Sequence, residues 1–309
     1  MSTTGVMRPG HVQIRVLDLD ESVKFYRDVL GLVQTGADAS GRVYFKAWDE
    51  YDHHSVILRQ ADEAGMDFLG FKVRDAATLE RLEADLRAYG VATERLPAGD
   101  LLETGARVRF TLPTGHVMEL YAHKTCVGNG QSNINPAPWT PESEHGMAPV
   151  RFDHCLLYGP DIDGVLKLFT EVLGFYLVEQ VLMEDGESKL AIFISCSHKA
   201  HDLAFVRHPE PGKLHHLSFL LPTWERVLRA ADLMSMNKVA IDIGPTRHGI
   251  TRGQTIYAFD PSGNRFETFA QGYDTYPDAP VRTWTWEEVG TGIFYHDRKL
   301  NERFLTVVT

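Results

Sequence analysis

The sequence has few cysteines, and their scarcity bears on the compartment in which the chain works. Only three occur among the 309 residues, Cys126, Cys155 and Cys196, and none stands in a Cys-x-x-Cys pair. An odd number of cysteines without paired spacing favours free thiols in a reducing compartment. Cys155 follows a histidine on a predicted strand, so its side chain points to the opposite face, and we expect a small buried residue.

The sequence also lacks a surplus of positive charge and a long apolar run. Lys and Arg total 31 against 42 Asp and Glu, which gives a formal net charge of -11. This balance argues against nucleic-acid binding, which needs a basic surface. No apolar run approaches the roughly 20 residues that span a membrane, and the first residues lack the apolar core of a signal peptide. We therefore expect a cytoplasmic protein with neither nucleic acid nor membrane as partner.

What the chain does have is an internal repeat. A repeat of this length is far longer than a solenoid period, so it indicates two similar domains, predicted at residues 1–122 and 150–272. Residues 123–149 are rich in Gly, Pro, Asn and Ser, as expected of a linker, and residues 273–309 form an extension that packs on the second domain. Three motif pairs carry the repeat: FYRDVLGL (25–32) with LFTEVLGF (168–175), DFLGF (67–71) with HHLSF (215–219), and PTGHVMEL (113–120) with PSGNRFET (261–268).

Each half follows the order strand, helix and further strands twice. HVQIRV at residues 11–16 alternates apolar and polar side chains, the period of a half-buried strand. Helices are expected over residues 20–30 and 75–89, the second with an apolar stripe that includes Tyr89, and Thr223 is expected to cap a later helix. The pattern predicts an α+β fold of four βαβββ units with cupped mixed sheets. Further strands are predicted at residues 42–48, 55–59, 107–111 and 117–122.

Three residues far apart in the sequence fall at matching places in successive motifs. They are His154 in RFDHCLLYG, His216 in LHHLSF and Glu267 in DPSGNRFETF. Two imidazoles and one carboxylate form a facial triad, which leaves half of an octahedral metal open to other ligands. Any one of the 14 histidines, taken singly, is more often a surface or structural residue. The whole set at repeated strand positions favours a metal site.

The faces of the two later strands agree with that interpretation. Side chains alternate along a strand, so His216 shares a face with Ser218 and Leu220. By the same alternation Glu267 shares a face with Phe269. A small polar neighbour beside the histidine is what a concave site needs.

The first half serves as an internal control. The positions that match the triad are His11, Phe68 and Glu119. An aromatic side chain replaces the middle ligand, so a facial triad cannot form there. His116 does not restore a site, because it corresponds to Asn264 and not to a ligand. We expect one metal per chain, in the second half, and a structural first half.

At this point the motifs resemble those of a known family. Over essentially its whole length the chain is similar to the extradiol ring-cleaving dioxygenases that act on catechols. The resemblance implies the vicinal-oxygen-chelate, or glyoxalase-like, fold of paired βαβββ modules, in agreement with the repeat. The motifs are MRPGHVQIRVLDLD, RFDHCLLYG, KAHDLAFV, HHLSF, IDIGPTRHGIT, TIYAFDPSGNRFE and IFYHDRKLNERF.

The resemblance also implies a cofactor, a reaction and an assembly. The cofactor is Fe(II), held by the triad, and the substrates are O2 and catechol or a substituted catechol. Meta cleavage beside the diol gives a 2-hydroxymuconate semialdehyde in the degradation of aromatic compounds, and the assembly is a homotetramer. Around the metal the family places His201, His248 and Tyr257. The aromatic-substrate pocket corresponds to Phe193, Ile250, Ile293 and Phe304.

The three residues around the metal have distinct expected roles. His201 is the expected acid–base residue, because an imidazole with a pKa near 6.5 can take and return a proton. His248 and Tyr257 are expected to bond the substrate oxygens and orient the ring. Each also has a structural interpretation: a loop histidine bonded to Asp202, an exposed turn histidine, and a core tyrosine with a satisfied hydroxyl.

Two other function classes fit the same fold, because a fold alone does not fix chemistry. A glyoxalase-type isomerase or lyase would use zinc or nickel and a fourth protein ligand. A metal-free binding protein that sequesters drugs would have no reason to keep two histidines and a glutamate at equivalent strand positions. An intradiol dioxygenase is disfavoured, since that class uses ferric iron and tyrosine ligands in an unrelated fold.

Overall fold

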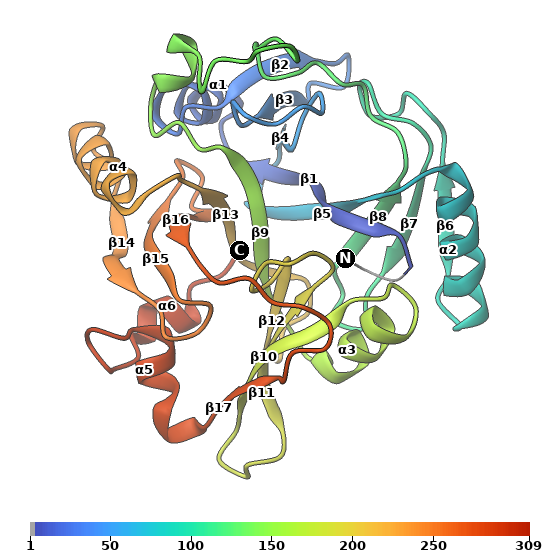
Figure 1. Cartoon of the computed structure of the whole chain (residues 1–309), viewed down its shortest axis with the longest axis vertical. Coiled ribbons are helices and arrows are strands. Elements are labelled where there is room, and N and C mark those ends of the chain that lie inside the picture. Colours follow the sequence, from blue (N-terminus) through green and yellow to red (C-terminus); the bar gives the residue numbers. More distant parts are fainter. Residues whose placement is uncertain (1–3) are drawn as a thin grey trace.

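The first half of the chain forms eight strands and two α-helices, coloured blue to green in Figure 1. The computed structural model describes residues 4–309. In chain order the elements are β1 (Val6–Val16), α1 (Leu19–Lys24), a π-helical turn η1 (Phe25–Val29), β2 (Val33–Ala37), β3 (Val43–Lys46), β4 (Val56–Gln60), β5 (Gly65–Val73), α2 (Ala76–Ala88), β6 (Thr93–Leu96), β7 (Arg107–Thr111) and β8 (Val117–Tyr121).

The second half repeats this order and adds a C-terminal segment. A short 3-10 helix, η2 (Pro141–Glu144), lies in the connection between the halves. The elements that follow are β9 (Arg151–Gly159), α3 (Ile162–Glu171), β10 (Tyr176–Leu182), β11 (Lys189–Ser195), β12 (Leu203–Arg207), β13 (Lys213–Leu220), α4 (Trp224–Met236), β14 (Ile241–Arg247), β15 (Gly253–Phe259), β16 (Arg265–Gln271), β17 (Arg282–Trp284), η3 (Trp286–Glu288), α5 (Val289–Ile293) and α6 (Glu302–Thr306).

The strands form two mixed sheets. The eight-stranded sheet has the order β2-β3-β4-β1-β5-β8-β7-β6, and the nine-stranded sheet has the order β14-β15-β16-β13-β9-β12-β11-β10-β17. In every βαβββ unit the opening strand pairs in parallel with the closing strand, as β9 does with β12 and β13 with β16. The predicted α+β class with four such units is confirmed. The opening strands β9 and β13 pair antiparallel in the middle of their sheet, where strand geometry is most constrained.

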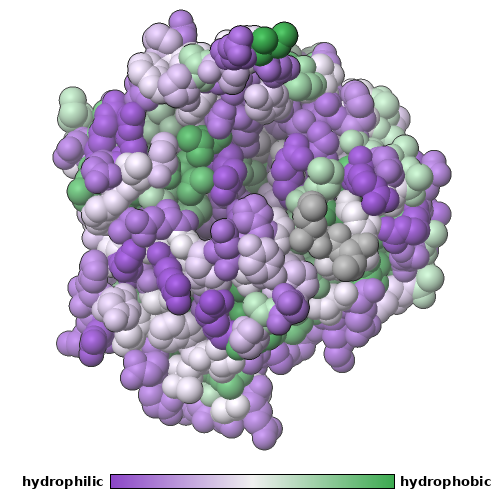
Figure 2. Space-filling view, in the orientation of Figure 1, coloured by the Kyte–Doolittle hydropathy of each residue, from purple (hydrophilic) through white to green (hydrophobic). Residues whose placement is uncertain are grey.

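The two halves share one apolar core. Phe71 of β5 lies with its ring centroid 5.4 Å from that of Phe175, and Phe25 lies at the same distance from Phe266. These contacts hold the second half against the sheet of the first. The face in Figure 2 is mostly hydrophilic, with hydrophobic residues in small groups. Among residues 4–309, no helix has the length and apolar character needed to cross a membrane.

Two helix starts follow the sequence pattern. Asp75 accepts a hydrogen bond from the Thr78 amide at 2.8 Å, and Thr223 caps α4 as predicted. Both bonds satisfy an amide that the first turn leaves free. The apolar stripe of α2 ends at Leu86, however, because the chain leaves the helix at Tyr89, whose side chain is 42% exposed. The inclusion of Tyr89 in that stripe was wrong.

The helix predicted over residues 20–30 differs from the structure. It begins at Leu19, capped by Asp18, and widens to a π-helical turn after Lys24. The widened turn accompanies the burial of Tyr26, whose hydroxyl donates to Asp260 of the second half at 3.0 Å. Tertiary contact therefore changes the helix locally.

The structure also differs from the prediction at the edges of the eight-stranded sheet and on the polar face of β1. Strands β2 and β6 were not predicted, because these edge strands are largely exposed and lack an alternating pattern. Strand β1 was expected to be half-buried, yet His11 and Gln13 on its polar face are buried too. The cupped sheet encloses that face as well as the apolar one.

The C-terminal segment lies against the nine-stranded sheet. Strand β17 pairs in parallel with β10, and the last residue, Thr309, exchanges backbone hydrogen bonds with Leu214 of β13. The backbone carbonyl of Phe304 accepts a hydrogen bond from His215 at 2.7 Å. The segment therefore reaches the strand that carries His216.

Buried His116 predicts an acid-dependent loss of stability. Burial lowers its pKa from 6.5 to about 4, although a hydrogen bond to the Lys213 carbonyl acts in the opposite direction. The unfolded chain therefore binds the proton first, and His116 costs the native state about 2 kcal/mol as the pH falls from 7 to 5.

We expect the unmodified protein to lose about 2 kcal/mol more free energy of unfolding than His116→Gln between pH 7 and pH 5. The variant lacks the titrating imidazole and is therefore relatively more stable at pH 5. Urea denaturation at both pH values measures it. The exposed His123→Gln variant is the control, and a pH-independent difference for His116→Gln would contradict the prediction.

Candidate metal centre

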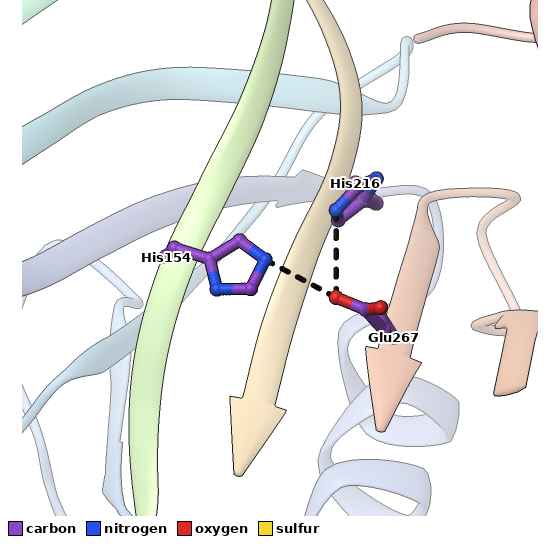
Figure 3. Close-up of side chains that lie close together, drawn as sticks. All are labelled: His154, His216 and Glu267. Atoms are coloured by element: carbon purple, nitrogen blue, oxygen red, sulfur yellow. Dashed lines mark ion pairs between the residues drawn. The ribbon is translucent and has the colours of Figure 1, made fainter. Parts of the chain in front are cut away.

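Three side chains from neighbouring strands point toward one another in the second half (Figure 3). His154 comes from β9, His216 from β13 and Glu267 from β16. The Nε2 atom of His154 lies 3.1 Å from Glu267 Oε2, and that of His216 lies 3.6 Å from the same oxygen. One potential ligand atom from each residue lies within 4.8 Å of the others, and all three residues are buried. The structure thus brings the predicted triad together.

Hydrogen bonds behind the triad fix how its members face. His154 Nδ1 donates to Asp153 Oδ2 at 3.0 Å, which turns Nε2 toward Glu267. The hydroxyls of Ser218 and Thr255 each donate to one oxygen of the Glu267 carboxylate. Such outer bonds orient metal ligands, and the carboxylate behind His154 also makes its imidazole a stronger ligand.

The protonation of the triad suits a divalent cation. Burial lowers the pKa of His216 well below 6.5, so this imidazole is neutral. Burial alone would raise the pKa of Glu267, but the hydrogen bond from His154 and the other imidazoles close to the carboxylate hold it well below 4.5. Burial also opposes the charged form of His154, whereas Asp153 and Glu267 together raise its pKa. A bound cation would replace the proton that His154 and Glu267 share, so the donor set fits a metal.

The matching place in the first half is already filled by basic side chains. His11 Nε2 lies 3.3 Å from Glu119 Oε2, as in the second half, but Phe68 occupies the third position. Arg107 Nε donates to Glu119 Oε2 at 2.8 Å, and Arg109 donates to the other oxygen. Arg109 on β7 is the cross-strand partner of Glu119 on β8. In the second half the corresponding partner of Glu267 is Tyr257 on β15. Guanidinium groups therefore neutralise Glu119 where a metal would neutralise Glu267.

His201 lies directly beside the triad. Its ring centroid is 4.0 Å from that of His154, and Phe193 packs edge-on against it at 5.4 Å. Burial and the neighbouring His154 lower the pKa of His201 well below 6.5, in contrast to the value near 6.5 expected from the sequence, so the imidazole is neutral. Asp202 bonds Ser195 and Lys199 and not His201. This argues against the alternative that His201 is only a loop histidine bonded to Asp202.

His248 and Tyr257 form a bonded pair on another side of the triad. His248 Nδ1 donates to the carbonyl of Ile293, so in the neutral imidazole Nε2 accepts a bond from the Tyr257 hydroxyl at 2.7 Å. His248 Nε2 also lies 3.8 Å from Glu267 Oε1. Burial and then the charge of Glu267 raise the pKa of Tyr257 well above 10, so its hydroxyl stays a proton donor.

One cavity of about 300 Å³ joins these groups. Volumes of this size and a mostly apolar wall with a few convergent polar groups are typical of small-molecule sites. Every residue predicted for the site lines it, and their individual roles remain predictions. The ten are His154, Phe193, His201, His216, His248, Ile250, Tyr257, Glu267, Ile293 and Phe304.

Sequence reasoning missed several contributors. Phe269 packs edge-on against His154 with centroids 5.2 Å apart and lines the cavity. Its position two residues after Glu267 on the same strand face was the available signal. His198 was not among the predicted site residues, yet it reaches the cavity wall as a largely exposed side chain. His215 was also not among the predicted site residues, although its Nδ1 atom lies 2.7 Å from Nδ1 of His216.

Comparison with known families adds a separate line of observation. Residues 66–125 match the catechol 2,3-dioxygenase-like N-terminal domain. Residues 151–268 match the glyoxalase/bleomycin resistance protein/dioxygenase superfamily.

Named relatives of similar length point the same way. The chain is 58% identical over 306 residues to a metapyrocatechase of Pseudomonas sp. strain CF600, with 99% of each chain covered. It is 27% identical to a manganese-dependent 2,3-dihydroxybiphenyl 1,2-dioxygenase of Geobacillus genomosp. 3, with 95% of each covered.

Solved structures agree in fold. The 2,3-dioxygenase LapB of Pseudomonas sp. KL28 superposes with a TM-score of 0.91 at 67% identity, covering 92% of this chain and 99% of that one. Homoprotocatechuate 2,3-dioxygenase of Brevibacterium fuscum, solved as an anaerobic complex with 3,4-dihydroxyphenylacetate, gives a TM-score of 0.88 at 26% identity, covering 99% and 93%.

Proposed function

The chain belongs to the extradiol ring-cleaving dioxygenases, and from that membership we propose that it opens catechol and substituted catechols beside the diol at an Fe(II) held by His154, His216 and Glu267. Both atoms of O2 enter the product, which is 2-hydroxymuconate semialdehyde when the substrate is catechol. The reaction therefore consumes no further oxidant or reductant. It serves the degradation of aromatic compounds.

The observation that carries this proposal is the convergence of the triad in the wall of a cavity that also has aromatic and aliphatic side chains. Two imidazole nitrogens and one carboxylate oxygen leave several positions of a metal free for substrate. Phe193, Ile250 and Phe304 supply flat apolar walls of the kind that an aromatic ring needs. A metal-free binding module would have no use for a buried carboxylate between two histidines.

Iron is the proposed metal, although one relative is a manganese-dependent dioxygenase by name. Both ions accept the same imidazole and carboxylate donors, so the donors alone do not separate them. When bound, Fe(II) would supply the redox chemistry that lets catechol react with O2. A glyoxalase-type zinc or nickel site would need a fourth protein ligand. Among the described residues only His154, His216 and Glu267 bring their ligand atoms together, and the nearby His248 bonds Tyr257.

The side chains around the cavity handle protons. We assign His201 the acid–base role, because it is neutral, buried and beside His154. It would accept a proton from the reacting oxygens and return it as the O–O bond breaks. The Tyr257 hydroxyl donates to His248, and this pair would bond the substrate oxygens and orient the ring.

The wider context of the enzyme is part of the proposal. We assign residues 150–272 as the catalytic domain, residues 1–122 as a structural domain, and residues 123–149 and 273–309 as linker and extension. The three cysteines are free thiols, which supports a cytoplasmic location. A homotetramer is the proposed assembly, by resemblance to the family.

Catechol added in air to protein reconstituted anaerobically with ferrous ion tests the function. We expect a yellow product and the uptake of one O2 per catechol, recorded by visible absorbance and an oxygen electrode. The same protein loaded with Mn(II) tests the choice of metal. Bound metal without a product would favour the isomerase class, and a protein that binds neither ion would favour a binding module.

A further inference from the structure

A second histidine lies directly behind a proposed metal ligand. His215 is 1% exposed, and its Nδ1 atom lies 2.7 Å from Nδ1 of His216. Its other ring nitrogen, Nε2, lies 2.7 Å from the backbone carbonyl of Phe304. A chain of two hydrogen bonds therefore runs from the C-terminal segment through His215 to His216.

The proton positions along this chain follow by elimination. A carbonyl oxygen only accepts, so His215 Nε2 must carry a proton and donate to Phe304. Only one proton fits between two Nδ1 atoms at hydrogen-bond distance. If His215 held that proton as well, His216 would carry its own proton on Nε2 and could not bind a metal. His216 must therefore donate from Nδ1, which leaves its Nε2 lone pair directed toward Glu267.

The first half of the chain shows which residues occupy the positions of His215 and His216 when no metal ligand is present. By the repeat, Phe68 takes the place of His216, and Asp67 takes the place of His215. Asp67 is bound to Arg59 and Arg15 toward the surface and has no bond to Phe68. Both the ligand and the residue behind it are thus absent from the half whose Glu119 is neutralised by arginines.

We propose that His215 is a positioning residue for His216. The Phe304 carbonyl holds the His215 proton on Nε2, so His215 Nδ1 accepts from His216 Nδ1 and thereby sets the tautomer and direction of the metal ligand. The inference rests on the proposed function for the identity of the metal only. Phe304 also lines the cavity with its ring. The segment that walls the substrate site therefore also orients the metal ligand.

His215→Phe tests this role with little change in shape. A phenyl ring can keep the stacking that His215 makes with Tyr158, where the ring centroids are 4.9 Å apart at 19°. It removes the acceptor for His216, and loss of such an outer partner typically costs about 10- to 100-fold in metal affinity. We expect that loss in the dissociation constant for Fe(II), measured anaerobically against a competing chelator. His208→Phe, whose ring centroid lies 5.6 Å from that of Tyr158, is the matched control and should bind Fe(II) normally.

Two amide variants separate orientation from packing and serve if the phenylalanine variant does not fold. The oxygen of His215→Asn can accept from His216 Nδ1, so this variant should recover most of the affinity. The amide of His215→Gln can reach the Phe304 carbonyl but not supply that acceptor, so it should stay weak. Equal affinities in Asn and Gln, or an unchanged affinity in Phe, would overturn the proposal.

Metal affinity keeps this inference separable from the proposed function. If the unmodified protein binds Fe(II) but does not cleave catechol, the proposed function fails while the role of His215 can still be read from the affinities. If it cleaves catechol and all His215 variants bind Fe(II) equally, the inference alone fails.

Discussion

His216→Ala is expected to lose bound metal and turnover together. The substitution removes one of three proposed ligands from a fully buried site and leaves the Glu267 carboxylate with one imidazole partner fewer. Loss of a direct ligand should cost more than the about 10- to 100-fold in affinity typical of outer partners. At micromolar protein, the variant should therefore retain little iron after desalting. Oxygen uptake with catechol should fall to background.

Metal analysis after anaerobic reconstitution provides the primary readout. Two controls separate the expected effect from misfolding. His208→Ala removes a histidine outside the cavity, and it should keep both iron and turnover. The far-ultraviolet circular dichroism of His216→Ala should match the unmodified protein, because the alanine leaves β13 and its pairing intact. Full iron occupancy in His216→Ala would show that the triad does not hold the metal.

The repeat explains why the architecture and the triad were predictable. Because the pattern is duplicated, each strand and helix occurs twice in the sequence. A residue such as His216 can therefore be compared with Phe68, which occupies the same position in the first half. Helix starts were predictable where a side chain caps its own helix, as at Asp75 and Thr223. These are local properties, and period-2 alternation placed His216 and Ser218 on one face for the same reason.

Features that depend on distant partners were not predictable. Nothing in the local pattern says that Arg107 and Arg109 neutralise Glu119, since that pairing needs the register of β7 against β8. The role of His215 likewise depends on the Phe304 carbonyl, 89 residues further along the chain. The edge strand β2 has no buried face to reveal it.

His201 lies between these two cases. The motif that contains it was recognisable, but its distance from His154 depends on how the residues between β11 and β12 fold. Lys199 helps to fix that segment, because its ammonium group bonds Asp153 and Asp202 at 3.1 and 3.0 Å. Since Asp153 also bonds His154, the same carboxylate links the loop of His201 to the metal centre.

His201→Phe is expected to keep the metal and lose most turnover. His201 is not within the group of converging ligand atoms, so its removal leaves the triad complete. A phenyl ring can keep the contacts that His201 makes with Phe193 and His154, but it cannot accept or return a proton. General acid–base catalysis contributes about 10²- to 10⁴-fold, and kcat should fall by that order. Iron content, catechol affinity and kcat are measured on the same preparation.

The control for this prediction is a histidine at the opening of the same cavity. His198 is largely exposed, and we expect His198→Phe to retain most of the activity. A His201→Phe variant that lost its iron would reassign His201 to metal binding. A variant that kept both iron and full turnover would instead leave proton transfer to Tyr257 and His248, the other hydrogen-bonding pair at the cavity. Retained iron with a large fall in kcat is the one result that the geometry beside His154 supports.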